Sequence, residues 1–282
     1  MRATVLDGAM GTALIARGLE AGALPEEWLR ERPEEIARVH TAHAAAGAEL
    51  VLTCTFNLAA PRLEARLGAF DPRPLARAAV ALARRAAPGA RVAGALGPTG
   101  LFGPGRAPPP AEEVRARYAA AAAALAAAGA DLLWLESQWD LAEARAALAA
   151  ALRAAAMVAV SFTGFLDGEG PPRLPDETPL LDALAAVAAD GAAIVGVNCV
   201  PAGETLADLV RQAGARFRTP LALKPSPGLP GAVLAPDRFA AALEPAIRAG
   251  ARYAGGCCGA TGAHVGAVAA LVRAQGSADA RG

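Results

Sequence analysis

Two adjacent cysteines, Cys257 and Cys258, lie between glycines directly after a short apolar run near the end of the chain. A third cysteine, Cys199, closes another apolar run, Ile-Val-Gly-Val-Asn. Thiolates are preferred zinc ligands, and three of them would leave one position of a tetrahedral ion open. An open position is typical of catalytic rather than structural zinc. The pattern therefore predicts a thiolate zinc site built from Cys199, Cys257 and Cys258.

Short apolar runs alternate with longer Ala/Leu-rich segments of helical spacing along the whole chain. This alternation predicts an α/β fold, a single (β/α)8 TIM barrel in which residues 1–282 form one domain. The predicted strands are 3–6, 49–54, 92–96, 131–135, 157–162, 193–198, 220–223 and 251–254, and predicted helices include 33–46, 111–128, 141–154, 236–249 and 263–274.

A barrel would bring the three cysteines together despite their separation in sequence. Functional side chains of this fold gather at the carboxyl ends of the strands. The carboxyl ends of the sixth and eighth predicted strands would lie at this same end of the barrel. Neighbouring residues of a regular strand point to opposite faces, so Cys257 and Cys258 can share a metal only where the strand ends or bulges. The surrounding glycines, Gly255, Gly256 and Gly259, give the backbone the freedom to do so.

Composition narrows the classes of partner and compartment. The 282 residues carry 27 Lys+Arg and 27 Asp+Glu, a formal charge of zero that predicts no nucleic-acid partner. The apolar stretch 118–130 is too short to span a bilayer, which predicts no membrane association. The first residues lack the apolar core of a signal peptide, so we expect a cytoplasmic protein. In a reducing compartment cysteines more often serve metal binding or catalysis than disulfides.

Several motifs occur in an order that resembles the homocysteine S-methyltransferase family, which includes betaine–homocysteine methyltransferase and the homocysteine-binding module of cobalamin-dependent methionine synthase. The resemblance runs nearly end to end, and the last two motifs are the most specific. In chain order the motifs are Leu-Asp-Gly-Ala-Met-Gly-Thr (6–12), Thr-Cys-Thr-Phe (53–56), Leu-Gly-Pro-Thr-Gly (96–100), Leu-Glu-Ser (135–137), Ser-Phe-Thr (161–163), Val-Asn-Cys (197–199) and Gly-Cys-Cys-Gly (256–259).

The resemblance implies methyl transfer to the thiol of homocysteine, forming methionine. Cys199, Cys257 and Cys258 would take part in catalysis by binding zinc, and the sulfur of homocysteine would occupy the fourth position. Asp7 and Glu136 would hold its amino group, and backbone amides near Gly8 would help to hold its carboxylate. An ordinary thiol has a pKa of about 8.5, and coordination to zinc deprotonates it at neutral pH.

The methyl donor is less well indicated by the sequence. The segment 224–230 reads Lys-Pro-Ser-Pro-Gly-Leu-Pro, whereas cobalamin-linked relatives have a Pro-Asn-Ala-Gly-Leu-Pro type of motif. The shared Gly-Leu-Pro favours a donor like that of methionine synthase. The donor would be a small molecule or carried by another protein, and a methylcobalamin donor would require a separate corrinoid protein.

Other interpretations remain open for most of these residues. The acceptor could be another small thiol, the chain could serve mainly as a binding module for a corrinoid carrier, and zinc storage is a further alternative. A cysteine can be a small buried apolar side chain, Asp7 a turn residue, and Glu136 a strand-end charge or helix cap. We expect Cys54 to lie in the core or behind the ligands, His40 and His43 on a helix surface, and His264 to have a structural role.

Overall fold

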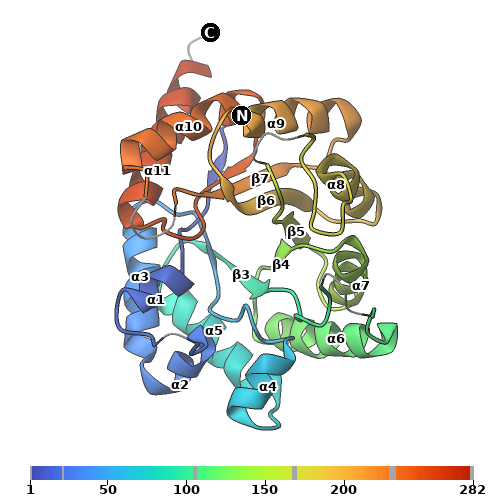
Figure 1. Cartoon of the computed structure of the whole chain (residues 1–282). Coiled ribbons are helices and arrows are strands. Elements are labelled where there is room, and N and C mark those ends of the chain that lie inside the picture. The colour runs from blue at the N-terminus through green and yellow to red at the C-terminus, as the bar shows by residue number, and fades with distance from the viewer. Residues whose placement is uncertain (1, 21, 104–106, 167–169, 229–232, 280–282) are drawn as a thin grey trace.

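Eight parallel strands form a barrel in the computed structural model, which describes residues 2–20, 22–103, 107–166, 170–228 and 233–279 (Figure 1). Their order is β1-β8-β7-β6-β5-β4-β3-β2, and a bridge between Leu6 and Leu50 joins the two ends. The predicted (β/α)8 barrel is therefore confirmed. The strands are β1 (Thr4–Val5), β2 (Leu50–Leu52), β3 (Arg91–Leu96), β4 (Leu132–Gln138), β5 (Val158–Phe162), β6 (Ile194–Pro201), β7 (Leu221–Ser226) and β8 (Tyr253–Ala254).

Helices surround the strands and match the predicted helical segments closely, apart from α11, which extends five residues beyond the predicted end at 274. Two short helices, α1 and α2, come before the helix predicted over 33–46, and a 3-10 turn, η1, lies between them. The helical elements are α1 (Gly11–Ile15), η1 (Pro25–Glu27), α2 (Trp28–Glu31), α3 (Pro33–Ala45), α4 (Pro61–Leu67), α5 (Pro72–Ala86), α6 (Ala111–Ala127), α7 (Leu141–Leu152), α8 (Leu180–Ala189), α9 (Glu204–Arg216), α10 (Pro236–Arg248) and α11 (Gly262–Asp279).

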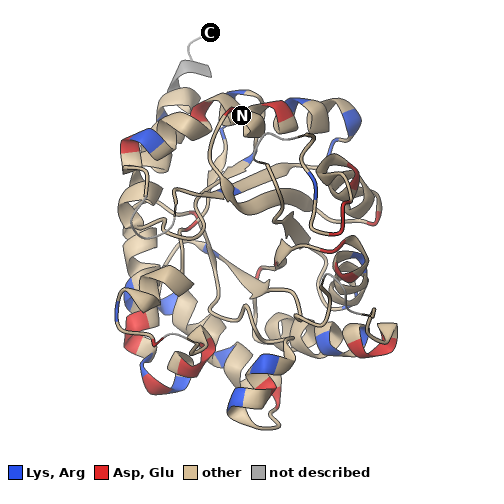
Figure 2. Ribbon diagram, viewed as in Figure 1, with Lys and Arg blue, Asp and Glu red and all other residues tan. Residues whose placement is uncertain are grey.

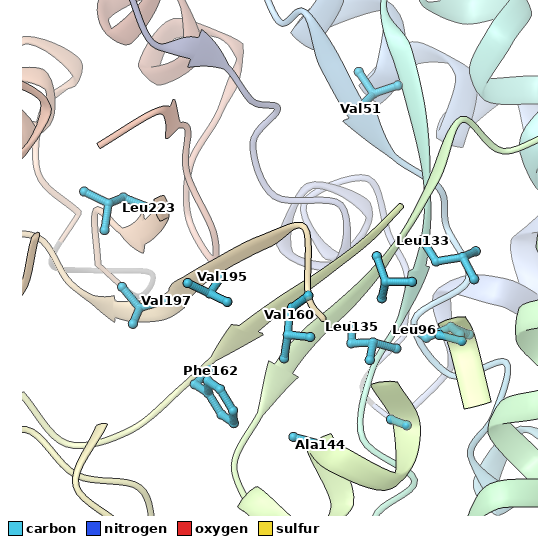
Figure 3. Packing of buried hydrophobic residues seen from close by; sticks show 14 of the residues in the cluster. Val51, Leu96, Leu133, Leu135, Ala144, Val160, Phe162, Val195, Val197 and Leu223 are labelled. Atoms are coloured by element: carbon cyan, nitrogen blue, oxygen red, sulfur yellow. The ribbon is translucent and has the colours of Figure 1, made fainter. Parts of the chain in front are cut away.

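Strand alternation divides the core into two parts. Leu132 and Trp134 of β4 belong to a cluster inside the barrel, whereas Leu133 and Leu135 of the same strand pack in the larger layer between strands and helices (Figure 3). Successive side chains of a strand point to opposite faces, and both faces of this sheet are covered. The next inward position on β4 is Glu136, which this alternation directs toward the mouth of the barrel.

Charged side chains of both signs are interspersed over the outer helices (Figure 2). Within the described part of the chain, no helix is both long enough and apolar enough to cross a membrane.

Candidate metal and substrate site

The three cysteines singled out by sequence lie together at the carboxyl ends of β6 and β8. Their sulfur atoms are all within 4.8 Å of one another, and the Sγ atoms of Cys199 and Cys258 are 3.6 Å apart. Tetrahedral zinc with Zn–S bonds of about 2.3 Å places its sulfur ligands about 3.8 Å apart. The distance between the Cys199 and Cys258 sulfur atoms is close to this value, and all three sulfur atoms lie close enough together to form one candidate set of metal ligands.

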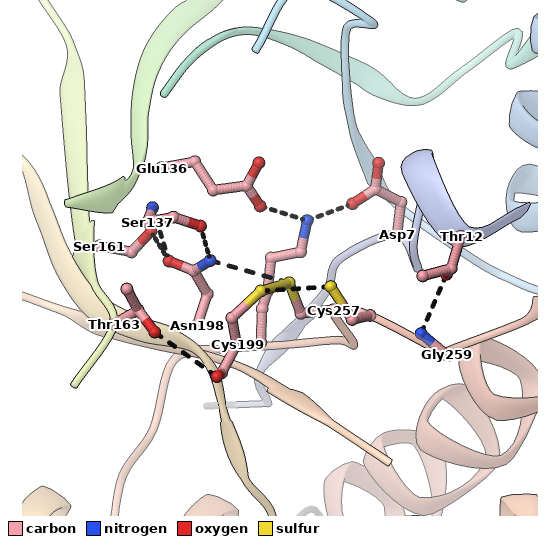
Figure 4. Close-up of a disulfide and its surroundings, with 12 residues drawn as sticks. Asp7, Thr12, Glu136, Ser137, Ser161, Thr163, Asn198, Cys199, Cys257 and Gly259 are labelled. Atoms are coloured by element: carbon pink, nitrogen blue, oxygen red, sulfur yellow. Dashed lines mark hydrogen bonds and ion pairs between the residues drawn. A yellow bond between two sulfur atoms is a disulfide. The ribbon is translucent and has the colours of Figure 1, made fainter. Parts of the chain in front are cut away.

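Cys199 and Cys257 are joined by a disulfide in this structure, with their Cα atoms 5.3 Å apart, while Cys258 is free (Figure 4). The sequence did not lead us to expect this bond. A disulfide sulfur has no negative charge to offer a metal, so the two residues can both act as thiolate ligands only after reduction. Burial and the nearby Glu136 carboxylate raise the pKa of the Cys258 thiol above its ordinary value.

Cys257 and Cys258 come after the end of β8, so the alternation of a regular strand does not direct their side chains to opposite faces. β8 stops at Ala254, and the glycines that follow are required by close packing. A side chain at Gly255 would lie 2.6 Å from the Cβ of Leu6, and one at Gly256 would lie 2.3 Å from the Cβ of Ala260. Of the three glycines predicted to give backbone freedom, only Gly259 has a left-handed backbone, with a φ of 84°.

Irregular backbone on β4 and β6 turns site residues toward the barrel mouth. The register of each strand pair shifts, between Leu135 and Gln138 on β4 and between Asn198 and Pro201 on β6. Ser137 and Cys199, within these shifts, have left-handed φ values of 57° and 54°. Non-glycine residues rarely adopt this conformation, and those that do are concentrated at functional sites.

Asn198 connects the two irregular segments to the cysteines. Its side-chain oxygen accepts hydrogen bonds from the Ser137 backbone N–H at 2.9 Å and the Ser161 hydroxyl at 2.7 Å. Its amide nitrogen donates to the Ser137 hydroxyl at 2.5 Å and approaches the Cys257 sulfur at 3.8 Å (Figure 4). The sequence identified Asn198 only as part of a motif, since an asparagine inside an apolar strand was the only signal of this role.

Asp7 and Glu136 face each other across the mouth, with the ammonium of Lys224 between them (Figure 4). Lys224 Nζ is 2.8 Å from Asp7 Oδ1 and 3.3 Å from Glu136 Oε1. Asp7 Oδ2 accepts a further hydrogen bond from the Leu52 backbone N–H at 2.8 Å. Burial disfavours the charged lysine, but the two carboxylates outweigh this and hold the pKa of Lys224 above its ordinary value.

The sequence expectation for the two carboxylates did not include this lysine. Lys224 is the only lysine in a chain whose other basic residues are arginines, and it stands at the end of a predicted strand. Those two facts were the available signal. The last two residues of the motif considered for the methyl donor, at 229 and 230, lie outside the described residues.

A cavity of about 350 Å³ opens in front of these groups. The three cysteines, Asp7, Glu136 and Lys224 line one part of it, and residues of the α1, η1 and β2–α4 segments line the rest. Gly8 also lines it, and a Cβ there would lie 2.6 Å from the Ala260 carbonyl oxygen and 2.8 Å from His43 Nε2. The absence of a side chain at Gly8 thus allows α3 and the Cys258 loop to approach β1 closely.

The fourth cysteine, Cys54, lies apart from the three in the described sulfur cluster, as predicted. It is buried and belongs to the apolar core, although it also reaches the cavity wall. Burial, with a smaller effect from the Glu26 carboxylate, raises the pKa of its thiol well above the ordinary value. A buried thiol of raised pKa is a poor nucleophile and a poor metal ligand.

The prediction that His40 and His43 lie on a helix surface was wrong, because the face of α3 that carries both is packed against the barrel. They are 0% and 2% exposed. Burial lowers the pKa of both rings, to about 4 for His40, although the charge of Asp7 opposes the shift. His264 is structural as expected, since its ring bonds Thr261 and the Leu234 carbonyl oxygen.

Comparison with known proteins agrees with this geometry. The family model described as homocysteine S-methyltransferase matches residues 4–272. The chain is 31% identical to homocysteine S-methyltransferase from Escherichia coli, over 94% of each protein. It is also 33% identical to methionine synthase from Mycobacterium tuberculosis over 96% of this chain, but it spans only 25% of that protein's length.

A solved structure shows the same fold. The metallated form of the homocysteine methyltransferase MmuM from Escherichia coli matches with a TM-score of 0.79 and 31% identity, over 96% of each chain. The family model covers nearly the whole barrel, including all three cysteines of the sulfur cluster. The chain therefore belongs to the homocysteine S-methyltransferase family.

Proposed function

We propose that the protein transfers a methyl group to the thiol of homocysteine, forming methionine, with zinc held by Cys199, Cys257 and Cys258. The proposal depends above all on one observation: three cysteine sulfur atoms lie within 4.8 Å of one another, beside a cavity that is also lined by Asp7 and Glu136. A set of three sulfur donors suits zinc better than the hard cations magnesium and calcium. The likeness to a metallated homocysteine methyltransferase supports the same assignment.

The zinc and three residues of the cavity wall would each have a role in this proposal. When bound, the zinc would supply the positive charge that keeps a coordinated acceptor thiol deprotonated at neutral pH. Glu136 would accept a hydrogen bond from the ammonium of homocysteine through Oε2, which receives none from the described residues. Asp7 contributes its charge, although both its oxygens are already engaged by Leu52 and Lys224. Backbone N–H groups near Gly8, which also lines the cavity, would help to hold the substrate carboxylate.

The cysteines must be reduced for this chemistry. Because the Cys199–Cys257 disulfide removes two of the three thiolates, activity would require a reducing compartment such as the cytoplasm. We therefore propose that the zinc-loaded protein is the form with both cysteines reduced.

The methyl donor is either a small molecule or a group carried by another protein. The second candidate function is a homocysteine-binding module that receives its methyl group from a separate corrinoid protein. The 33% identity to part of a methionine synthase favours this candidate. Turnover with S-methylmethionine alone would support the small-molecule donor, and turnover only with a methylated corrinoid carrier would support the module.

X-ray absorption at the zinc edge tests the acceptor without knowledge of the donor. The reduced, zinc-loaded protein should show three sulfur ligands, and addition of homocysteine should raise the number to four. A sulfur count that does not change with homocysteine would contradict the proposal. Failure of the reduced protein to bind zinc would contradict it as well.

A further inference from the structure

Lys224 occupies the position that the ammonium group of an amino-acid acceptor would be expected to take. Its Nζ lies 2.8 Å from Asp7 and 3.3 Å from Glu136, so it bridges the two carboxylates (Figure 4). The side chain is only 3% exposed, and Asp7 beside it is equally enclosed. The bridge is therefore an enclosed part of the cavity wall rather than a surface ion pair.

The bridge changes the charge that an acceptor meets. Two buried carboxylates without a cation are strongly unfavourable, and an acceptor ammonium would relieve that cost. Here the protein supplies the cation itself, so one net negative charge remains in place of two. An acceptor without an ammonium group then leaves no uncompensated pair of carboxylates behind.

An acceptor that carries an ammonium group gains less binding energy from the two carboxylates than it would if Lys224 were absent. Asp7 Oδ2 accepts from Leu52 and Asp7 Oδ1 from Lys224, so Glu136 Oε2 is the remaining acceptor of the pair. A second ammonium at Glu136 would lie close to that of Lys224, and like charges repel. The attraction to Glu136 is therefore partly offset.

We propose that Lys224 is a specificity-determining residue that makes binding of the acceptor thiol largely independent of an α-ammonium group. The site would then take small thiols that bear a carboxylate but no amino group, in addition to homocysteine. This inference rests on the proposed function, because it assumes that the acceptor thiol binds at the metal held by the three cysteines.

Binding to the cobalt-loaded protein tests the inference, because sulfur coordination changes the absorption spectrum of cobalt whereas zinc is silent. Homocysteine and 4-mercaptobutanoate, which differ only in the amino group, are titrated into the reduced wild-type protein and the K224M and K224R variants. We expect wild-type Kd values within about tenfold of each other. In K224M the preference for homocysteine should rise by at least about tenfold, and K224R, which keeps the charge, should stay near wild type.

The outcomes separate this inference from the proposed function. Wild-type protein that binds homocysteine more than about tenfold tighter than 4-mercaptobutanoate overturns the role of Lys224 and leaves the proposed function standing. An unchanged preference in folded K224M overturns it in the same way. A cobalt spectrum that responds to neither thiol overturns both. The wild-type comparison needs no variant, so the test holds even if K224M fails to fold.

Discussion

The side chain of Asn198 holds Ser137 at two points, accepting a hydrogen bond from its backbone N–H at 2.9 Å and donating one to its hydroxyl at 2.5 Å. Ser137 adjoins Glu136, and Asn198 adjoins Cys199. This pair therefore links the irregular segment of β4, which carries a proposed substrate carboxylate, to that of β6, which carries a proposed metal ligand. The Trp134 indole and Ser161 extend the same network into the barrel interior.

Replacement of Asn198 by alanine should weaken both the fold and the metal site. Asn198 is fully buried, and its loss would leave the Ser137 N–H and the Ser161 hydroxyl without their partner. Unsatisfied buried groups of this kind cost about 1–3 kcal/mol each, and loss of a group behind metal ligands lowers affinity about 10- to 100-fold. Denaturant unfolding and a competitive zinc titration measure the two effects.

The S161A variant is the matched control for N198A, because it removes one partner of the network but leaves the Asn198–Ser137 pair in place. It should lose less stability and keep zinc affinity close to wild type. Equal zinc affinity in wild type and N198A would show that the network supports the barrel but not the metal.

Removal of Cys258 should abolish zinc binding, whereas removal of Cys54 should not. Cys258 belongs to the sulfur cluster, while Cys54 lies in the apolar core. Metal content measured by mass spectrometry after reduction should fall from one zinc per chain to near zero in C258A. C54A should remain loaded and lose only the stability of a small buried side chain. Full zinc loading of C258A would remove this residue from the ligand set.

Glu136 and Asp7 should respond differently to neutral replacement. E136Q removes the charge that an acceptor ammonium would meet, but its amide oxygen can still accept a hydrogen bond from Lys224, so homocysteine binding should weaken by less than about tenfold and stability should fall less than in D7A. D7A removes the acceptor of the Leu52 N–H and a partner of buried Lys224, so it should cost several kcal/mol of stability. Isothermal titration with homocysteine and thermal unfolding separate the two. Undiminished homocysteine affinity in E136Q would exclude Glu136 from substrate binding.

A methyl group at Gly8 should be far more damaging than one at Gly11, although both residues line the cavity. A Cβ at Gly8 would lie 2.6 Å from a carbonyl oxygen, whereas one at Gly11 meets nothing within 4 Å. Overpacking costs about 1–3 kcal/mol, and alanine in place of glycine inside a helix is neutral or stabilising. Chemical denaturation should show G8A destabilised and G11A unchanged or improved. Equal stability of the two would contradict the close approach of β1 and the Cys258 loop.

The barrel and the position of the cysteines could be predicted from sequence because each depends on local patterns. Apolar runs ending in functional residues mark the strands, and strand ends meet on one rim whatever their distance in sequence. The Asp7–Lys224 contact could not be predicted in this way, since it joins residues 217 positions apart through side chains alone. Neither could the left-handed φ of Cys199, because a register shift depends on the neighbouring strand.

The error at His40 has a similar physical origin. The i, i+3 spacing of His40 and His43 shows that they share a helix face, but helical spacing alone does not say which face is buried. Hydrophobic patterning is weak in α3, which is rich in alanine, so the sequence of the helix does not mark the face that carries the histidines as the packed one. The effect of the Asp7 charge on the pKa of both rings depends on the assembled barrel, because the histidines and Asp7 are distant in sequence.

Burial of His40 should make the protein sensitive to mild acid. Burial lowers the pKa of this ring from 6.5 to about 4, so the folded state resists a proton that the unfolded chain accepts. The stability that depends on the neutral His40 ring should therefore be fully present well above pH 6.5 and be lost as the pH drops through 6.5 to about 4, by up to about 3 kcal/mol. Urea unfolding of wild type and H40L across this range tests the effect.

The leucine of H40L has a volume similar to that of histidine and cannot be protonated, so H40L should lose less stability on acidification. His43, whose pKa is also lowered by burial, remains in both proteins and contributes a shared acid sensitivity. Parallel pH profiles for the two proteins would show that His40 does not resist protonation in the folded state.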